Sequence, residues 1–324
     1  MNQPRTRVPF GTWPSPISPS MMAENLRLGD VQWDRSGRHL VWLEGRSDRG
    51  LLMVTQHNDP AAATELTTAD HSVRAGVGYG GGDFTVADGV AFFVEQKSGR
   101  IFRQPLASGA ARPITPGHGR CASPTVSPDG RYVLFVHSDG KDDCIAIVDA
   151  DGKHWPQRLA WKADFFMQPC WSPDGKRIAF VSWKHPQMPW DGTVLMLADL
   201  SWSDAPLPWC SSIRELAGSD HVSIFQPQFT PDGKQLGFMS DETGFSNLYI
   251  QDLASGDRDA VTRHKAELAR PAWAQGIRTW GFLPDGKRAV YAANERGLHR
   301  LFVVDLGTRE SVRVDTAEQY TAID

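Results

Sequence analysis

The stretch VSPDGR at Val126–Arg131 recurs along the chain and decides its fold. Close copies are WSPDGK, FTPDGK and FLPDGK, which begin at Trp171, Phe229 and Phe282, and looser copies are WDRSGR at Trp33 and VADGVA at Val86. Each copy is followed by an apolar run such as YVLFVHS, RIAFVSW or QLGFMSD. The copies follow one another at intervals of roughly 40–60 residues, which is the period of β-propeller blades. The sequence therefore predicts an all-β propeller.

The turn chemistry explains how each unit is built. Proline sets φ near −65°, aspartate accepts a bond from the backbone ahead of it, and glycine tolerates a positive φ. A third strand of near-alternating character and a weaker fourth strand follow each apolar run, which indicates four-stranded antiparallel blades. We predict an N-terminal extension at 1–25 and a propeller at 26–324, with blades at about 26–68, 72–116, 121–160, 164–217, 222–263 and 270–316.

The two ends of the chain carry weaker signals. Near the N-terminus, SPSMMAENLRLG predicts a short helix, with Ser20 as its cap and Gly29 as its stop. Residues 317–324 match the start of a seventh unit, which leaves the number of blades at six or seven. Because an uncapped repeat array exposes a strand edge, we expect a domain fragment or part of a split gene.

Composition excludes several functional classes. The net charge of −4 provides no basic field, so nucleic acid is not an expected partner. No apolar run reaches about 18 residues, and the N-terminus lacks the apolar segment of a secretory signal, so we expect neither a membrane span nor export. The 4 cysteines and 10 histidines are scattered, which predicts free thiols, no metal site, no cofactor and a cytoplasmic location.

The block WKHPQMPWD is the longest irregular insertion in any unit and supplies most of the candidate site. Long aromatic loops with prolines can form binding surfaces, since the prolines reduce the entropy lost on ordering. We predict that this loop contacts a substrate or another domain; the alternative is that its tryptophans pack the loop onto its own blade. We assign no catalytic role to its histidine, because no nucleophile stands near it in the pattern. The candidates here are Trp183, His185, Met188, Trp190 and Asp191.

A second candidate is Tyr79, which precedes Gly80, Gly81 and Gly82. Consecutive glycines permit left-handed geometry and close approach of another backbone. A phosphate-binding loop would also need a Lys-Ser/Thr pair and a following helix, which are missing here. We therefore favour a crossing between blades at this position. The recurring turn aspartates lack the further oxygen ligands that a calcium site requires.

Several stretches together resemble one branch of the prolyl oligopeptidase family of serine peptidases, the dipeptidyl aminopeptidase and acylaminoacyl peptidase branch. The resemblance covers essentially the whole chain and corresponds to the N-terminal propeller of that family. Two positions depart from the family pattern, Gly78 before the glycine run and Lys184 in the tryptophan block. The matching stretches are FGTWPSPIS at Phe10, VQWDRSGRHLVWLEGR at Val31, YGGGDFTV at Tyr79, WKHPQMPWDGTVL at Trp183, SIFQPQFTPDGKQLGFMSDETGFSNLY at Ser223 and ELARPAWAQGIRTWGFLPDG at Glu267.

The resemblance implies a non-catalytic propeller that gates peptide access to an α/β-hydrolase domain, so the implied partners are a peptide substrate and that domain. The hydrolase of that family carries its serine on a Gly-x-Ser-x-Gly elbow, and the nearest string here, Gly244–Leu248, lacks the second glycine. We expect no catalysis by this chain alone and a serine exo- or oligopeptidase as its parent. Two alternatives stay open: a stand-alone TolB-like propeller that binds a protein or peptide, and, less favoured, an enzyme with a site in its own channel. The sequence does not predict an oligomeric state.

Overall fold

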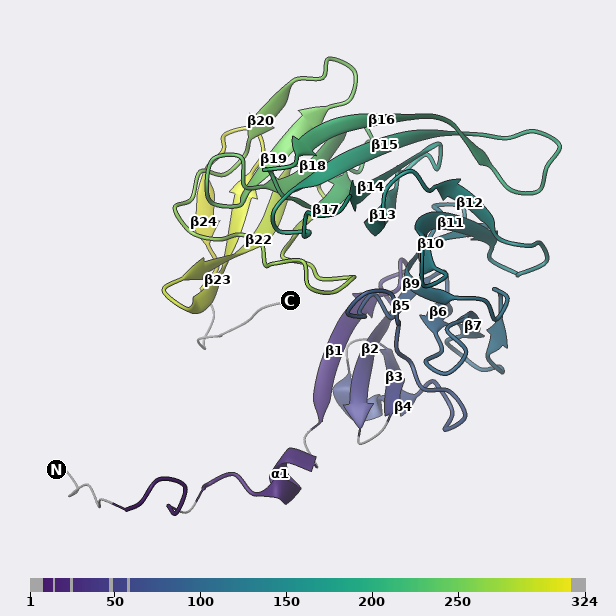
Figure 1. Ribbon diagram of the computed structural model, residues 1–324, viewed down its shortest axis with the longest axis vertical. Helices are drawn as coiled ribbons and strands as arrows, with labels where there is room; N and C mark the ends of the chain where they lie inside the picture. The colour runs from purple at the N-terminus through teal and green to yellow at the C-terminus, as the bar shows by residue number, and fades with distance from the viewer. Residues whose placement is uncertain (1–7, 14, 24–25, 47–48, 57–58, 316–324) are drawn as a thin grey trace.

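The described residues form six four-stranded antiparallel sheets. The sheets follow one another around a ring in the order of the chain (Figure 1). A computed structural model describes residues 8–13, 15–23, 26–46, 49–56 and 59–315. In every sheet the four strands are neighbours in the same order as in the sequence. The predicted all-β propeller of four-stranded blades is therefore confirmed, and in these described ranges helix is limited to two short pieces, α1 (Pro19–Ala23) and η1 (Pro60–Ala62).

The strands are distributed over the six blades in chain order. The first three blades consist of β1 (Arg27–Trp33), β2 (His39–Arg46), β3 (Arg49–Gln56) and β4 (Thr64–Glu65); β5 (Phe84–Ala87), β6 (Val90–Val94), β7 (Ile101–Pro105) and β8 (Arg112–Pro113); and β9 (Arg120–Val126), β10 (Tyr132–Ser138), β11 (Asp143–Asp149) and β12 (Gln157–Ala160). The last three consist of β13 (Phe165–Trp171), β14 (Arg177–Trp183), β15 (Thr193–Ser201) and β16 (Trp209–Ser219); β17 (Ile224–Phe229), β18 (Gln235–Ser240), β19 (Asn247–Asp252) and β20 (Arg258–Ala260); and β21 (Trp280–Phe282), β22 (Arg288–Glu295), β23 (Leu298–Asp305) and β24 (Ser311–Arg313).

The Pro-Asp-Gly turns join the first and second strands of the blades as their chemistry predicts. Gly175 and Gly233 both have a φ of +70°, which glycine adopts without steric cost. In the turn after β13, Asp174 Oδ1 accepts bonds from the Lys176 amide at 3.0 Å and from the Ser172 hydroxyl at 2.6 Å. The same two bonds recur around Asp232 in the fifth blade, so one local solution is repeated around the ring.

Strands at the centre of a blade are apolar on both faces because each blade lies between two others. Along β14, Ile178 and Phe180 belong to the buried cluster that joins blades two to four. The alternate residues Ala179 and Val181 belong to the cluster that joins blades four to six. Successive side chains of a strand point to opposite faces, so a continuous apolar run serves two interfaces at once.

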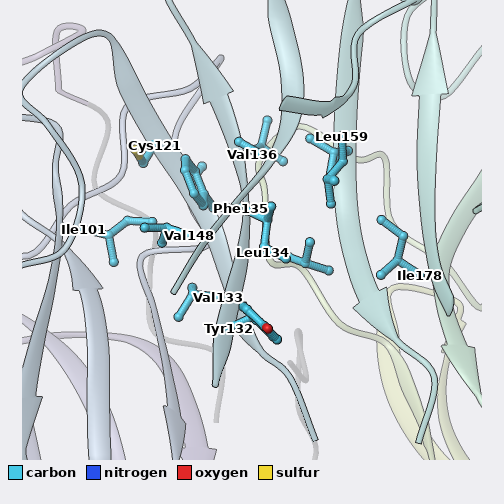
Figure 2. Close-up of a cluster of buried hydrophobic side chains, with 14 of the residues drawn as sticks. Ile101, Cys121, Tyr132, Val133, Leu134, Phe135, Val136, Val148, Leu159 and Ile178 are labelled. Carbon is cyan, nitrogen blue, oxygen red and sulfur yellow. The ribbon is translucent and has the colours of Figure 1, made fainter. Parts of the chain in front are cut away.

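The cluster around β10 shows this two-sided packing directly. Figure 2 shows Phe135 directed toward Ile101 of the second blade and Leu134 directed toward Ile178 of the fourth. All four side chains are at most 1% exposed. Full burial of a large apolar side chain contributes about 1.5–3 kcal/mol, so these interfaces contribute substantially to stability.

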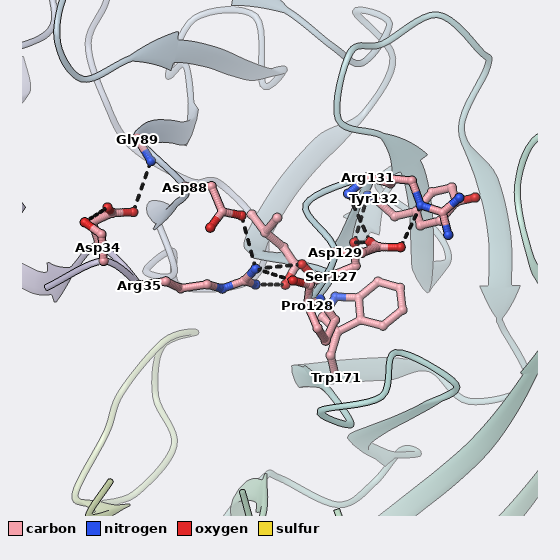
Figure 3. A network of polar contacts seen from close by, with 12 residues as sticks. Asp34, Arg35, Asp88, Gly89, Ser127, Pro128, Asp129, Arg131, Tyr132 and Trp171 are labelled. Carbon is pink, nitrogen blue, oxygen red and sulfur yellow. Dashed lines mark hydrogen bonds and ion pairs between the residues drawn. The ribbon is translucent and has the colours of Figure 1, made fainter.

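At the end of the blades that carries the Pro-Asp-Gly turns, Arg35 ties the first blade to the third (Figure 3). Its guanidinium donates to the carbonyl oxygens of Val126, Ser127 and Pro128 at 2.6, 2.9 and 3.1 Å. The same group lies 3.4 Å from the Asp88 carboxylate in the second blade. One cation therefore bridges three blades through charge-assisted bonds, which are stronger than neutral ones.

The sixth and first blades meet differently from the other neighbours. Within the described part of the chain, buried apolar clusters join each consecutive pair from the first blade to the sixth, but none joins the sixth to the first. A polar link replaces them, because Arg278 pairs with Asp30 and donates to the Val31 carbonyl at 2.8 Å. On β1, Leu28 and Trp33 are exposed. The predicted start of a seventh unit at 317–324 lies outside the described residues.

The short N-terminal helix exists, but its predicted ends are wrong. The Met21 amide donates to Ser18 Oγ at 3.1 Å, so the cap lies two residues before Ser20. Gly29 does not end the helix, because it lies within β1. Strand pairing with β2 there outweighs the local stop signal.

The cysteines are free thiols, as predicted. Burial raises the pKa of the Cys121 and Cys170 thiols to about 12, so they are protonated and poor nucleophiles. Within the described ranges, no group of three or more His, Cys, Asp or Glu side chains is placed to hold a metal ion. None of the helices described is long and apolar enough to cross a membrane.

Stability should depend on pH through His264, which packs against the sixth blade. Its Nε2 lies 2.6 Å from the Tyr291 hydroxyl, and its ring lies 5.2 Å from that of Phe302. Burial lowers the pKa of His264, against a smaller opposing effect of the Glu295 charge. Because the folded pKa is depressed, the unfolded chain takes up the proton more readily, and stability falls as the pH drops below about 6.5.

We therefore expect a lower free energy of urea unfolding at about pH 5.5 than at about pH 7.5, and a smaller difference in His264→Gln. An unchanged difference in the variant would show that other groups cause the pH dependence.

Candidate functional site

The topology places most of the predicted site residues at one end of the blades. In an antiparallel meander, the start of the first strand and the link between the second and third strands lie at the same end. We call this end the loop face and the opposite end, with the Pro-Asp-Gly turns, the turn face. Tyr79 precedes β5, and the tryptophan block links β14 to β15, so both lie at the loop face.

Trp183 and His185 pack on their own blade. The Trp183 ring stacks on Phe165 with centroids 5.2 Å apart, and the His185 ring meets the same phenylalanine edge-on at 4.8 Å. The His185 amide donates to Asp164 Oδ2 at 2.8 Å. These two residues thus anchor the start of the loop, which matches the packing alternative for this part of the block.

Met188 and Asp191 shape the rest of the loop. The Asp191 carboxylate accepts a bond from the Met188 amide at 3.2 Å, and the Asp191 amide donates to the Met188 carbonyl at 2.9 Å. This reciprocal pair closes a tight turn. Asp191 therefore orders the loop and holds Trp190 in place.

Trp190 and Tyr79 come together through a residue that the sequence analysis did not select. The rings of Trp190 and Trp273 lie 4.3 Å apart, and Trp273 meets Tyr79 edge-on at 5.6 Å. Tyr79 is 73% exposed and Trp273 is 52% exposed. The three rings form a surface that we call the aromatic cluster. Trp273 stands in the matched stretch ELARPAWAQGIRTWGF, which was the available signal for it.

Next to the aromatic cluster, the backbone of a distant segment packs directly against the glycine run. The sequence favoured a crossing between blades at this position. The Gln275 amide donates to the Gly80 carbonyl at 2.8 Å, and Gly81 forms a parallel bridge with Gln275. Gly80, Gly81 and Gly82 have φ values of +86°, +81° and +62°. A Cβ at Gly81 would collide with the Gln275 carbonyl oxygen, so this approach requires glycine.

A cleft of about 900 Å³ lies between the third and fourth blades beside the tryptophan block. Trp161, Trp183 and Ile213 supply apolar walls, and Lys184 and Asp220 supply charge. The cleft is lined by Trp183 but by no residue of the aromatic cluster. The predicted site residues are therefore divided between the cleft and the aromatic cluster.

The string Gly244–Leu248 runs from the turn after β18 into the start of β19. A nucleophile elbow instead requires a sharp strand-to-helix turn. The local structure around Ser246 is therefore that of a β-turn with no elbow geometry.

The chain is similar to part of solved structures and curated sequences that are named as peptidases. A puromycin-hydrolysing peptidase of Mycobacterium tuberculosis superimposes on 98% of the chain with a TM-score of 0.83 and 27% identity, over 51% of its own length. An uncharacterized peptidase of Bacillus subtilis, YuxL, is 28% identical over 189 residues, which are 58% of this chain and 24% of that protein. The chain is homologous to the propeller portion of prolyl-oligopeptidase-family peptidases. The resemblance found in the sequence is thereby confirmed.

Other comparisons bear on the alternative. The Tol-Pal system protein TolB of Nitratidesulfovibrio vulgaris is 26% identical over 134 residues, which are 41% of this chain and 26% of that protein. No protein-family profile matches the sequence. The matched regions cover about half the length of the solved peptidase and about a quarter of the curated one.

Proposed function

We propose that this chain is the non-catalytic propeller of a serine peptidase, and that it covers an α/β-hydrolase domain and filters the peptides that reach it. The observation that carries the proposal is the superposition of 98% of the chain on half of a puromycin-hydrolysing peptidase. The other half of such a peptidase has ample length for a catalytic domain. Free cysteines are consistent with the cytoplasmic location that we propose for the parent enzyme.

The loop face has the properties expected of the surface that meets the hydrolase domain. The aromatic cluster is exposed there, and aromatic residues are enriched in protein interfaces. The N-terminal extension leads into β1 from the same end and carries Phe10, which is 97% exposed, and Ile17, which is also exposed (Figure 1). The turn face carries charged turns such as Asp129–Arg131 beside exposed tryptophans such as Trp155. The contact among the three rings of the aromatic cluster, two of them at least half exposed, favours a partner at the loop face.

A seventh blade belongs to the same proposal. It would pack between the sixth and first blades, against the exposed side chains of Leu28 and Trp33. These two residues lie on an innermost strand, and the corresponding strands of later blades are mostly buried, as in β17.

The reading frame that follows the codon for Asp324 tests the proposal most directly. We expect an in-frame segment with a further blade and a hydrolase domain that contains a Gly-x-Ser-x-Gly elbow. A stop codon at that point would contradict the proposal and favour the stand-alone propeller. The 134-residue similarity to TolB is the observation that supports this second candidate, which would bind a protein or peptide partner.

Trp190→Ala should weaken the association of this propeller with the hydrolase segment supplied as a separate polypeptide. We expect at least about a tenfold increase in Kd, because buried tryptophans are frequent hot spots of interfaces. Folding should be retained, since Trp190 lies in a loop and is only partly buried. Calorimetry would measure the Kd, and circular dichroism would check the fold.

The matched control is Trp155→Ala. Trp155 is 76% exposed and lies in the link between β11 and β12, at the turn face. We expect no change in Kd from this substitution. Equal weakening by both variants would contradict a loop-face interface, and unfolding of the Trp190 variant would assign that residue to packing.

A further inference from the structure

One segment, Trp273–Trp280, extends at the loop face from the start of the sixth blade to the innermost strands of the blades opposite. We call it the crossing segment. It leads into the sixth blade, yet Gln275 donates from Nε2 to the Phe166 carbonyl at 2.9 Å and accepts at Oε1 from the Ser123 hydroxyl at 3.0 Å. Those partners belong to the fourth and third blades, and Gly80 and Gly81 belong to the approach to the second. A residue that touches three blades remote from its own spans the opening that they surround.

A repeated backbone feature holds the remainder of the crossing segment. Ser123, Gln168 and Gln226 occupy the same position in β9, β13 and β17, each before a proline, with φ values of +48°, +53° and +51°. Each lies at an irregularity in the pairing of its strand with the next one. Bulges redirect side chains out of the sheet, and here they direct them toward the crossing segment.

These side chains bind successive residues of the crossing segment. Ser123 binds Gln275, and two residues further along the crossing segment Gln168 Nε2 donates to the Ile277 carbonyl at 3.1 Å. Gln226 Oε1 then accepts from the Thr279 amide at 2.7 Å. With Arg278 paired to Asp30 of the first blade, the crossing segment touches all five other blades.

Ahead of Trp280 the crossing segment is held by many hydrogen bonds, whereas Trp280 itself is 5% exposed and packs in the cluster that joins blades four to six. Individual hydrogen bonds contribute about 0.5–1.5 kcal/mol, less than the burial of a large apolar side chain. The part before β21 has no regular secondary structure, and Trp273 is half exposed. Segments of this kind open locally at a free-energy cost below that of global unfolding.

We propose that the part of the crossing segment ahead of β21 is a removable plug of the opening at the centre of the ring, displaced when an extended peptide passes through the ring toward the loop face. In the closed state the crossing segment bonds the Gly80 and Phe166 carbonyls and the Gln168 side-chain amide. When the segment is displaced, these groups lose their partners unless a ligand replaces it. An extended peptide offers the same donors and acceptors, so its chemistry fits the vacated site. The role of the plug in admitting substrate rests on the proposed function, whereas its local opening does not.

Hydrogen–deuterium exchange of the purified chain, read by mass spectrometry, tests the plug. We expect amides of the crossing segment to exchange at least about tenfold faster than those of β18, with Gly81→Ala accelerating the crossing segment by a further tenfold or so. The added methyl group would collide with the Gln275 carbonyl oxygen and expel the segment. Exchange of the wild-type crossing segment at the rate of β18 would overturn the proposal.

Gly78→Ala is the matched control for this experiment. Gly78 lies in the same loop with a φ of +56°, but a Cβ there meets nothing within 4 Å, so we expect no acceleration. If Gly81→Ala does not fold, Gln275→Ala removes the side-chain bonds without added bulk and should give the same local acceleration. No acceleration in a folded Gln275 variant would also contradict the plug. A stop codon after Asp324 together with local opening would refute the proposed function and leave the plug intact.

Discussion

Phe238→Ala should lower the free energy of unfolding by about 3–5 kcal/mol, the usual cost of deleting a fully buried aromatic side chain. Phe238 is 0% exposed in β18, and its ring stacks on Tyr249 with centroids 6.2 Å apart. It belongs to the cluster that joins blades four to six, so the loss would loosen contacts between blades as well as within one. Urea unfolding followed by tryptophan fluorescence would measure the change.

Phe245→Ala provides the matched control, with the same atoms removed in the same blade. Phe245 is 43% exposed in the turn between β18 and β19, so its loss should cost less than about 0.5 kcal/mol. If Phe238→Ala cost no more than this control, the inter-blade cluster would not be the source of stability that the packing indicates.

The blade framework could be predicted because its determinants are local. The turn that contains Asp174 and Gly175 needs a proline, an acceptor and a positive φ at adjacent positions, and all three appear in the sequence. The apolar run from Arg177 to Trp183 predicts a strand buried on both faces without knowledge of its neighbours. Repetition then makes a weak local signal strong, because six units support the same interpretation.

The candidate site could be predicted only in part, because its contacts are long-range. The sequence selected Tyr79 and Trp190, but Trp273, which connects them, lies far along the chain. The glycine run predicted close approach of a backbone, and nothing local identified Gln275 as its partner. Contacts between residues of different blades depend on the closure of the ring, which a single repeat does not encode.

Gln226→Leu, which keeps the volume of the side chain, should cost about 1–3 kcal/mol and should couple strongly to Gln228→Leu. Gln226 bonds the Thr279 amide and the Trp280 carbonyl, each at 2.7 Å, and is only 4% exposed, so its loss leaves the Thr279 amide buried without a partner. The Trp280 carbonyl keeps a second donor, Gln228 Nε2 at 3.1 Å, so Gln228→Leu alone should cost less than about 1 kcal/mol. Only the double variant removes both donors, and its cost in urea unfolding should exceed the sum of the single costs by about 1 kcal/mol or more. Simple additivity would mean that water or another group replaces the lost donors, and that the innermost strand of the sixth blade is held mainly by its pairing with β22 and by the packing of Trp280.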